Sequence, residues 1–317
     1  MHRIAYTVVP NFQVMVFAGM TVFELANRIA PEPYYDVHLL SAEGGLVQTS
    51  MGIPMPTELA GRKSFDTVIA AGALDIEPAP KKLLAFLRRA ATSSRRIASV
   101  CTGAFVLAEA GVLNGRRATT HWSYARDLQA NYPQVKVEED RIFVVDGPVW
   151  TSAGMTASID LALGMVERDL GTEHARTVAK RLVVYQRRGG GQMQHSALLD
   201  LDAKTDRIQS ALAFARRNLH KPLAVEHLAE AAHLSPRQFS RAFRAETGQS
   251  PAKAIETLRV EAARVMMEQS RHPIEVVASE TGFADRERMR RAFLRAFGQP
   301  PQAMRRNAKI GAATTED

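Results

Sequence analysis

The sequence predicts a mostly parallel, flavodoxin-like α/β sandwich, followed by an all-α domain that holds two helix-turn-helix units. Short apolar runs alternate with helical patterns in the first part of the chain, whereas no convincing strand follows Asp206. Three glycines, Gly189 to Gly191, separate the two patterns. Glycine weakens both helices and strands because it loses the most backbone entropy on folding. We therefore expect an N-terminal domain at 1–188, a linker at 189–205 and a C-terminal domain at 206–310.

The N-terminal domain is expected to hold buried strands, because its apolar runs are short and nearly continuous, as strands of a parallel sheet are when helices cover both faces. These runs lie at 4–9, 37–41, 67–71, 97–100, 142–145 and 149–151. Apolar residues at helical spacing predict helices at 81–91, 104–110, 158–170 and 172–187.

Composition describes an ordinary globular protein, with 46% hydrophobic and 23% charged residues in 317. Cys101 is the only cysteine, so an intrachain disulfide is impossible, which fits a reducing compartment. The N-terminus lacks a signal-peptide layout, and every apolar run ends well before the length of about 18 residues that a membrane span needs. These features predict a cytoplasmic protein without a membrane partner.

The positive charge is concentrated in the C-terminal domain. Residues 206–310 hold 19 Lys+Arg and 11 Asp+Glu, a net charge of +8, whereas residues 1–205 hold 22 and 20, a net charge of +2. The terminal Glu316 and Asp317 bring the total to +8. A localised positive charge favours a polyanionic partner for the C-terminal domain.

Two segments of the C-terminal domain repeat one another, residues 228–251 and 277–301. Phe243 aligns with Phe293 at a separation of 50 residues, whereas Ala229 aligns with Ala278 at 49. The second segment therefore has one extra residue in its turn. A repeat whose length varies only in a turn is typical of duplicated helical units.

Each repeat fits a helix-turn-helix. In the first, Ser235 is expected to cap a helix that begins at Pro236, and in the second Gly282 supplies the turn and Asp285 the cap. The inner faces of the two second helices are Phe239, Ala242 and Phe243, and Met289, Ala292 and Phe293. Their outer faces carry Arg237, Gln238, Ser240, Arg241 and Arg244, and Arg286, Glu287, Arg288, Arg290 and Arg291.

A basic helix face can be a solvated surface or a DNA-reading surface. Two such faces in tandem favour DNA, because arginine can bond guanine edges in the major groove and fix the register on phosphates. A long helix at 251–269, with an apolar stripe of Ala254, Leu258, Ala262, Val265 and Met266, would hold the two readers apart. A separation near one DNA turn, about 34 Å, would place both in successive major grooves.

Cys101 lies in a pattern of strand, tight turn and helix, with small residues on both sides. We expect a sharp elbow that holds the thiol above a helix N-terminus, where its pKa would be lowered. His121 is the possible partner of Cys101. The alternative is a buried cysteine that acts as a small hydrophobe. The candidate ligand-pocket residues are Cys101, Thr102, His121 and Gly72.

Cofactor and metal sites are not expected. Gly44, Gly45 and Gly52 shape turns, since no GxGxxG or Walker pattern surrounds them. The histidines have no spacing suited to a metal ion beside the cysteine.

Residues 206–306 resemble the DNA-binding domain of AraC/XylS-type transcriptional regulators, which implies recognition helices at 235–247 and 285–297. That family often has an aromatic residue where Met289 stands and a tyrosine where Met304 stands, so apolar packing is kept in both places. Residues 4–188, with SVCTGAFVLAEAGVLNGRRATTHW as the clearest segment, resemble the PfpI-like branch of class I glutamine amidotransferase-like domains. Together the two domains resemble the GlxA family.

Enzymes on this fold place an acidic residue from an N-terminal helix beside the cysteine. In the alignment anchored on FELAN that position is Thr21, and Glu24 is the nearest carboxylate. The resemblance therefore implies a non-catalytic sensor domain. A Cys-dependent hydrolase or glyoxalase-like enzyme with a DNA-binding appendage, and an interaction module in which Cys101 reports oxidation, are the alternatives.

The resemblance also implies partners. They are double-stranded promoter DNA, a small-molecule effector such as an amino acid or a betaine-like compound, RNA polymerase and a second copy of the chain in a homodimer. Activation of transcription is expected more than repression.

Overall fold

The computed structural model describes residues 1–184, 188–190, 194, 205–270, 272–297 and 300–305. The chain forms two compact units, Met1–Gln194 and His195–Asp317. The division falls inside the predicted linker at 189–205, and most of the second half of that linker, 195–204, lies outside the described residues.

The first unit is built on an eight-stranded sheet in the order β3-β4-β2-β1-β5-β6-β10-β9. The pairs from β4 to β10 are parallel, and the two edge strands, β3 and β9, are antiparallel to their neighbours. The strands are β1 His2–Thr7, β2 Tyr35–Ser41, β3 Gly45–Gln48, β4 Pro54–Leu59, β5 Thr67–Ala70, β6 Arg96–Val100, β9 Phe143–Asp146 and β10 Val149–Ser152. The mostly parallel sandwich predicted from the sequence is confirmed.

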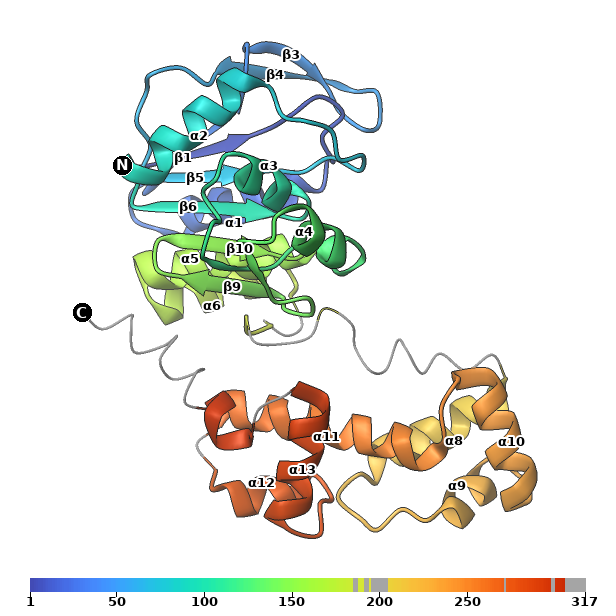
Figure 1. Cartoon of the computed structure of the whole chain (residues 1–317). Coiled ribbons are helices and arrows are strands. Elements are labelled where there is room, and N and C mark those ends of the chain that lie inside the picture. Colours follow the sequence, from blue (N-terminus) through green and yellow to red (C-terminus); the bar gives the residue numbers. More distant parts are fainter. Residues whose placement is uncertain (185–187, 191–193, 195–204, 271, 298–299, 306–317) are drawn as a thin grey trace. The chain divides into compact units, whose positions relative to one another are not determined.

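Helices cover both faces of this sheet (Figure 1). One apolar core joins the sheet to α2 Lys81–Ser93, α3 Gly103–Glu109 and α4 Ala125–Asn131, and a second joins it to α1 Val16–Ile29, α5 Ala157–Leu170 and α6 Thr172–Arg181. A short 3-10 helix, Trp122–Tyr124, precedes α4, and a two-stranded parallel sheet pairs β7 Arg117–Ala118 with β8 Lys136–Val137. The carboxyl ends of the central strands β1, β5 and β6 lead into the loops that form the candidate site.

The edge hairpin β3–β4 has no counterpart among the predicted strands. Two prolines, Pro54 and Pro56, lie in β4, and most of its side chains are exposed, so the segment lacks the buried apolar run that identified the other strands. Leu40 and Ser41 of β2 pair with the last residues of β4, beyond both prolines.

Helix α6 ends earlier than predicted, at Arg181 instead of residue 187. Val183 adopts a left-handed conformation with φ 57°, and the backbone N–H of Val184 donates to the carbonyl of Ala179. That arrangement closes the helix, and residues 185–187 lie outside the described part.

The second unit is all helical in its described residues. Its helices are α8 Asp206–Arg217, α9 Val225–Ala231, α10 Pro236–Thr247, α11 Pro251–Gln269, α12 Ile274–Glu280 and α13 Arg286–Phe297. One core packs α8, α9 and α10 against the start of α11, and another packs α12 and α13 against its end. Each repeat thus has its own core, and α11 joins the two (Figure 1).

The apolar stripe predicted for α11 is only partly right. Ala254 and Leu258 are buried, but Ala262, Val265 and Met266 are half-buried, and the buried residues of the second half are Val260, Ala263, Arg264 and Met267. The helix contacts two separate cores, so its buried face changes direction near its middle.

A bilayer-spanning helix is absent from the part of the chain that the structure describes.

Candidate nucleic-acid interface and effector cavity

Helix α10 begins as the sequence predicts. The Ser235 hydroxyl accepts from the backbone N–H of Gln238, while the Gln238 side chain accepts from the N–H of Ser235, and Pro236 occupies the first turn. Helix α13 has the equivalent cap, since Asp285 Oδ1 accepts from the N–H of Arg288 at 2.7 Å. Both caps fix the residues on which each second helix begins.

The turn before each second helix contains a left-handed residue. His233 has φ 54° and Gly282, 49 positions later, has φ 77°. A Cβ on Gly282 would lie 1.8 Å from the carbonyl oxygen of Leu219, so only glycine fits there. The first helix-turn-helix unit tolerates a histidine at the equivalent position because the side chain of His233 is exposed.

The inner and outer faces of both second helices are confirmed. Phe239, Phe243, Met289, Ala292 and Phe293 are buried, and Ala242 is half-buried. Met304 packs against the second core as well, so the apolar character at both atypical positions is kept. The predicted outward residues Arg237, Gln238, Arg241, Arg244, Arg286, Glu287, Arg288, Arg290 and Arg291 are exposed, and Ser240 is half-buried.

Ion pairs distinguish the two outer faces. Glu287 and Arg290 form two hydrogen bonds of 2.8 Å, Arg286 pairs with Glu275 at 3.3 Å, and Arg288 lies 3.7 Å from Asp285. The bond from Arg290 holds the pKa of the Glu287 carboxyl below its ordinary value. On α10, by contrast, Arg237, Arg241 and Arg244 have no carboxylate partner among the described residues.

Cys101 lies at the end of β6, immediately before α3, in the sharp elbow that the sequence predicts. Its backbone is left-handed, with φ 55°. Gly72 and Gly103 let the chain after β5 approach the elbow closely, because a Cβ on Gly72 would lie 2.0 Å from Thr102 Oγ1 and one on Gly103 would lie 2.1 Å from the Ala70 carbonyl oxygen. The Thr102 hydroxyl donates to the carbonyl of Ala73 at 2.6 Å, which ties the elbow to this chain segment.

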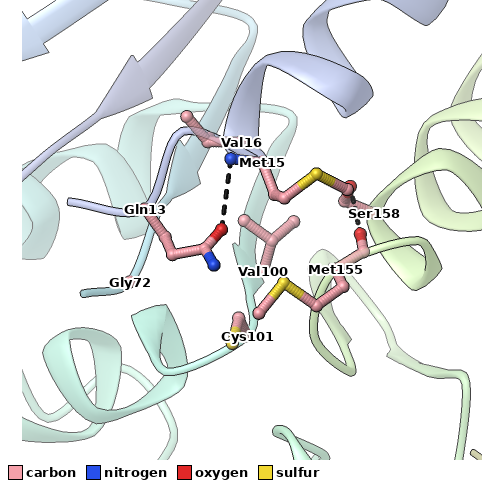
Figure 2. A pocket seen from close by; sticks show the side chains of 8 residues that line it. All are labelled: Gln13, Met15, Val16, Gly72, Val100, Cys101, Met155 and Ser158. Carbon is pink, nitrogen blue, oxygen red and sulfur yellow. Dashed lines mark hydrogen bonds between the residues drawn. The ribbon is translucent and has the colours of Figure 1, made fainter. Parts of the chain in front are cut away.

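A small cavity opens beside the thiol (Figure 2). Its enclosed part has room for about one water molecule, and the rest of the hollow is open to solvent. The side chains come from the segment before α1, from β6 and its elbow, and from the segment at the start of α5. The lining residues are Gln13, Met15, Val16, Gly72, Val100, Cys101, Met155 and Ser158.

Of the four predicted pocket residues, Cys101 and Gly72 line this cavity, whereas Thr102 and His121 lie next to it. Thr102 is buried, 3% exposed, under the elbow. A Cβ on Gly154 would lie 3.0 Å from Cys101 Sγ and 2.5 Å from His121 Cδ2, so the two side chains flank the same point. The Nδ1 atom of His121 is 2.7 Å from the Ser123 hydroxyl.

The expected lowering of the thiol pKa is wrong. Burial raises the pKa of Cys101 above its ordinary value, and hydrogen bonds from Thr102 and from the backbone of Met155 oppose that effect without overcoming it. The reason is that removal of the thiolate from water costs more than these hydrogen bonds return.

Carboxylates are absent from the described lining of the cavity. Glu24, the acid nearest in sequence to the expected position, is exposed and pairs with Arg28 at 3.0 Å. Thr21 donates its hydroxyl hydrogen to the carbonyl of Phe17, one turn earlier in α1. No cluster of potential metal ligands occurs among the residues that the structure describes.

The lining residues Gln13, Met15, Met155 and Ser158 were not predicted from the sequence. Gln13 Oε1 accepts from the N–H of Met15 at 3.1 Å, and its amide nitrogen points toward the thiol side of the cavity (Figure 2). Met155 is left-handed, with φ 55°. Nothing in the residue spacing shows that the segment of Met155 and Ser158 meets the segment before α1.

Comparisons with known proteins agree with this architecture. The helix-turn-helix domain family matches residues 228–307, and the DJ-1/PfpI family matches residues 14–168. The transcriptional regulator GlxA of Rhizobium meliloti is 30% identical over 312 residues, which cover 96% of each chain. Isonitrile hydratase of Pseudomonas putida is 35% identical over 184 residues, 57% of this chain and 77% of that one.

A crystal structure of an AraC family transcriptional regulator from Pseudomonas putida superposes with a TM-score of 0.53 and 25% identity, covering 57% of this chain and all of the other. The fold and the tandem units define a DNA-binding regulator of transcription. The chain belongs to the GlxA-like family of AraC-type regulators, which join a DJ-1/PfpI domain to a helix-turn-helix domain.

Proposed function

We propose that the chain is a one-component regulator of transcription whose N-terminal domain binds a small metabolite in the cavity beside Cys101. The observation that carries this proposal is the chemistry of the lining. Every described lining residue is uncharged, and burial raises the pKa of the thiol, so Cys101 is a neutral hydrogen-bonding group. An apolar wall with a few polar groups suits a small ligand, and a metabolite would widen this small cavity when it binds.

The same features support a non-catalytic domain. A cysteine nucleophile needs a thiolate and a group that accepts or returns a proton. The thiol pKa is raised and the described lining holds no carboxylate, which leaves His121, beside the thiol, as the proton acceptor of the enzyme alternative. The similarity to an isonitrile hydratase makes an enzyme the second candidate.

The C-terminal end of the first unit offers a route for the signal. Arg188 bonds the Asp160 carboxylate through its backbone N–H and its Nε atom, both at 2.9 Å, and bonds Thr156 at 2.8 Å. Asp160 and Thr156 lie on the segment that supplies Met155 and Ser158 to the cavity. A ligand that moves this segment acts directly on the chain that leads to the second unit.

A second tie lies beside His121. The Gln194 side chain accepts from the N–H of Trp122 and donates to the carbonyl of Thr120, both at 2.8 Å. A ligand changes transcription only through its differential affinity for two states. We infer that these two ties differ between the ligand-bound and the ligand-free state.

In the proposed mode of action, α10 and α13 enter major grooves of promoter DNA in the cytoplasm. Two copies of the chain form a homodimer that reads two half-sites, and the bound protein activates RNA polymerase. The effector classes to test first are amino acids, betaine-like compounds and small neutral amides.

Ligand-dependent thermal stabilisation of the full chain tests the cavity. A compound that raises the Tm of the native protein should raise that of Gln13→Leu much less, because this variant keeps the size of the side chain but removes its amide. Gln48→Leu, an exposed substitution on β3, is the matched control and should respond like the native protein. Equal stabilisation of all three proteins would show that the ligand binds elsewhere.

Turnover decides between sensor and enzyme. If the native protein converts a bound compound and the Cys101→Ser variant does not, the N-terminal domain is an enzyme and not only a sensor. A transcriptional response to peroxide that Cys101→Ala removes would instead support a redox module.

A further inference from the structure

The two second helices can be superposed residue by residue. Both contain 12 residues, and α13 begins and ends 50 positions after α10. Residues at i, i+4 and i+7 form one stripe along a helix. The stripe opposite the buried face is Arg237, Arg241 and Arg244 on α10, and Glu287, Arg291 and Leu294 on α13.

The outermost stripes therefore differ in chemistry at equivalent positions. On α10 all three side chains are exposed cations without a carboxylate partner in the described residues. On α13 the first position is an acid, the second a cation and the third an apolar side chain that is 37% exposed. The flanking cations of α13 are already paired, Arg290 with Glu287 and Arg295 with Glu256 at 2.6 Å.

Each stripe meets the negative DNA backbone differently. Three unpaired arginines release counterions wherever they meet phosphates, and this part of their binding does not depend on the sequence. A carboxylate at the same position repels phosphates and gains only from a donor on a base edge. Cytosine N4 is such a donor, guanine accepts from arginine, and the thymine methyl group contacts apolar side chains.

We propose that the two helix-turn-helix units divide DNA recognition between them, with α10 as the electrostatic anchor and α13 as the base reader. Glu287 accepts from a cytosine amino group, Arg291 donates to a guanine and Leu294 contacts a thymine methyl. Arg290 holds the Glu287 carboxylate in place and leaves it further lone pairs for the base. This inference rests on the proposed entry of both helices into major grooves.

Selection from a randomised 30-base-pair duplex library with the full-length protein tests the reader. The native protein should enrich sites with a required cytosine, and Glu287→Gln should lose that requirement while binding a single arbitrary duplex several-fold more tightly at low salt. Glu280→Gln is the matched control, because it removes an equal charge from an exposed position on α12. It should leave the enriched sequences unchanged.

Salt titration tests the anchor. Arg244→Leu gives α10 the side chain found at the equivalent position of α13, and it should reduce the slope of log K against log salt by about 1 while the enriched sequences stay the same. Leu294→Ala should leave the slope unchanged and weaken the preference for thymine.

The outcomes separate the two levels of inference. If the native protein enriches no sequence, promoter recognition itself fails and this division fails with it. If it enriches a sequence that Glu287→Gln enriches equally, or if Arg244→Leu leaves the salt slope unchanged, the division of tasks is wrong although DNA binding stands.

Discussion

At the scale of single residues, Cys101 shows how burial decides chemistry. The thiol occupies a strained elbow of the kind that often marks functional sites, yet burial raises its pKa instead of lowering it. A protonated thiol donates a weak hydrogen bond to a ligand but is a poor nucleophile. This residue therefore fits recognition better than turnover.

Because Cys101 is the only cysteine, its alkylation is a direct measure of this pKa. Iodoacetamide should modify the native protein more slowly than a free thiol peptide at pH 7.5, with the rate still rising above pH 9. Mass spectrometry of the intact chain follows the reaction. A midpoint below pH 8 would mean an activated thiolate and would favour the enzyme.

His38 gives a pH dependence of stability. Burial alone would lower its pKa, but hydrogen bonds to Glu58 and Asp36, at 2.6 and 2.8 Å, raise it above its ordinary value of 6.5. The stabilisation from its charge is therefore fully present below pH 6.5 and is lost as the pH rises through the raised pKa. Protonated His38 ties β2 to β4.

His38→Gln should reduce the free energy of unfolding by about 1 kcal/mol or less near pH 6, and by a smaller amount at pH 8.5, because the pairs are partly exposed. Urea unfolding of both proteins at the two pH values measures the difference. The pair also weakens at low pH, once the pH falls through the lowered pKa of Glu58 and its carboxylate becomes protonated. A larger loss at pH 8.5 than at pH 6 would contradict the assignment.

At the scale of elements, the two helix-turn-helix units solve one turn with different residues. A left-handed backbone costs an ordinary residue about 1–2 kcal/mol relative to glycine. The first helix-turn-helix unit has this cost at His233, and the second helix-turn-helix unit avoids it with Gly282. Capping by Ser235 and Asp285 then starts the next helix in both.

Substitutions at these equivalent positions should have opposite signs. His233→Gly should stabilise the protein by about 1 kcal/mol. Gly282→Ala should destabilise it by more than about 1 kcal/mol, because the new Cβ would clash with the Leu219 carbonyl and the backbone would keep an unfavourable φ. Thermal unfolding of both variants beside the native protein measures the two effects. Destabilisation by His233→Gly would show that the imidazole makes a contact that outweighs the strain.

At the scale of the whole molecule, the cavity and the two helix-turn-helix units belong to different compact units of the chain. The exit segment of Met1–Gln194 is attached to the cavity wall. Arg188 neutralises Asp160, whose side chain is only 4% exposed. Loss of the arginine would leave a largely buried carboxylate without this cation. The tie at Arg188 thus combines local stability with the proposed signal.

Arg188→Gln should lower the free energy of unfolding by at least about 1 kcal/mol and reduce the effect of an effector on DNA affinity. DNA binding without effector should remain, because the substituted residue belongs to the first unit. Fluorescence anisotropy with a promoter duplex, with and without ligand, measures this coupling. Arg181→Gln on α6 is an exposed control, and equal coupling in both variants would exclude the route through Arg188.

The sequence alone determined the fold class, the two helix-turn-helix units with their caps, and the elbow at Cys101, because these depend on periodicity and on turn chemistry between near neighbours. Only the tertiary structure decided the neutral lining, the direction of the thiol pKa and the pairing of Arg295 with Glu256. Those properties depend on burial and on which distant side chains meet. The sequence did not predict the hairpin β3–β4, because β4 contains prolines and mostly exposed side chains. It predicted the buried face of α11 only in part, because the helix packs against two separate cores and its buried residues do not follow one periodic stripe.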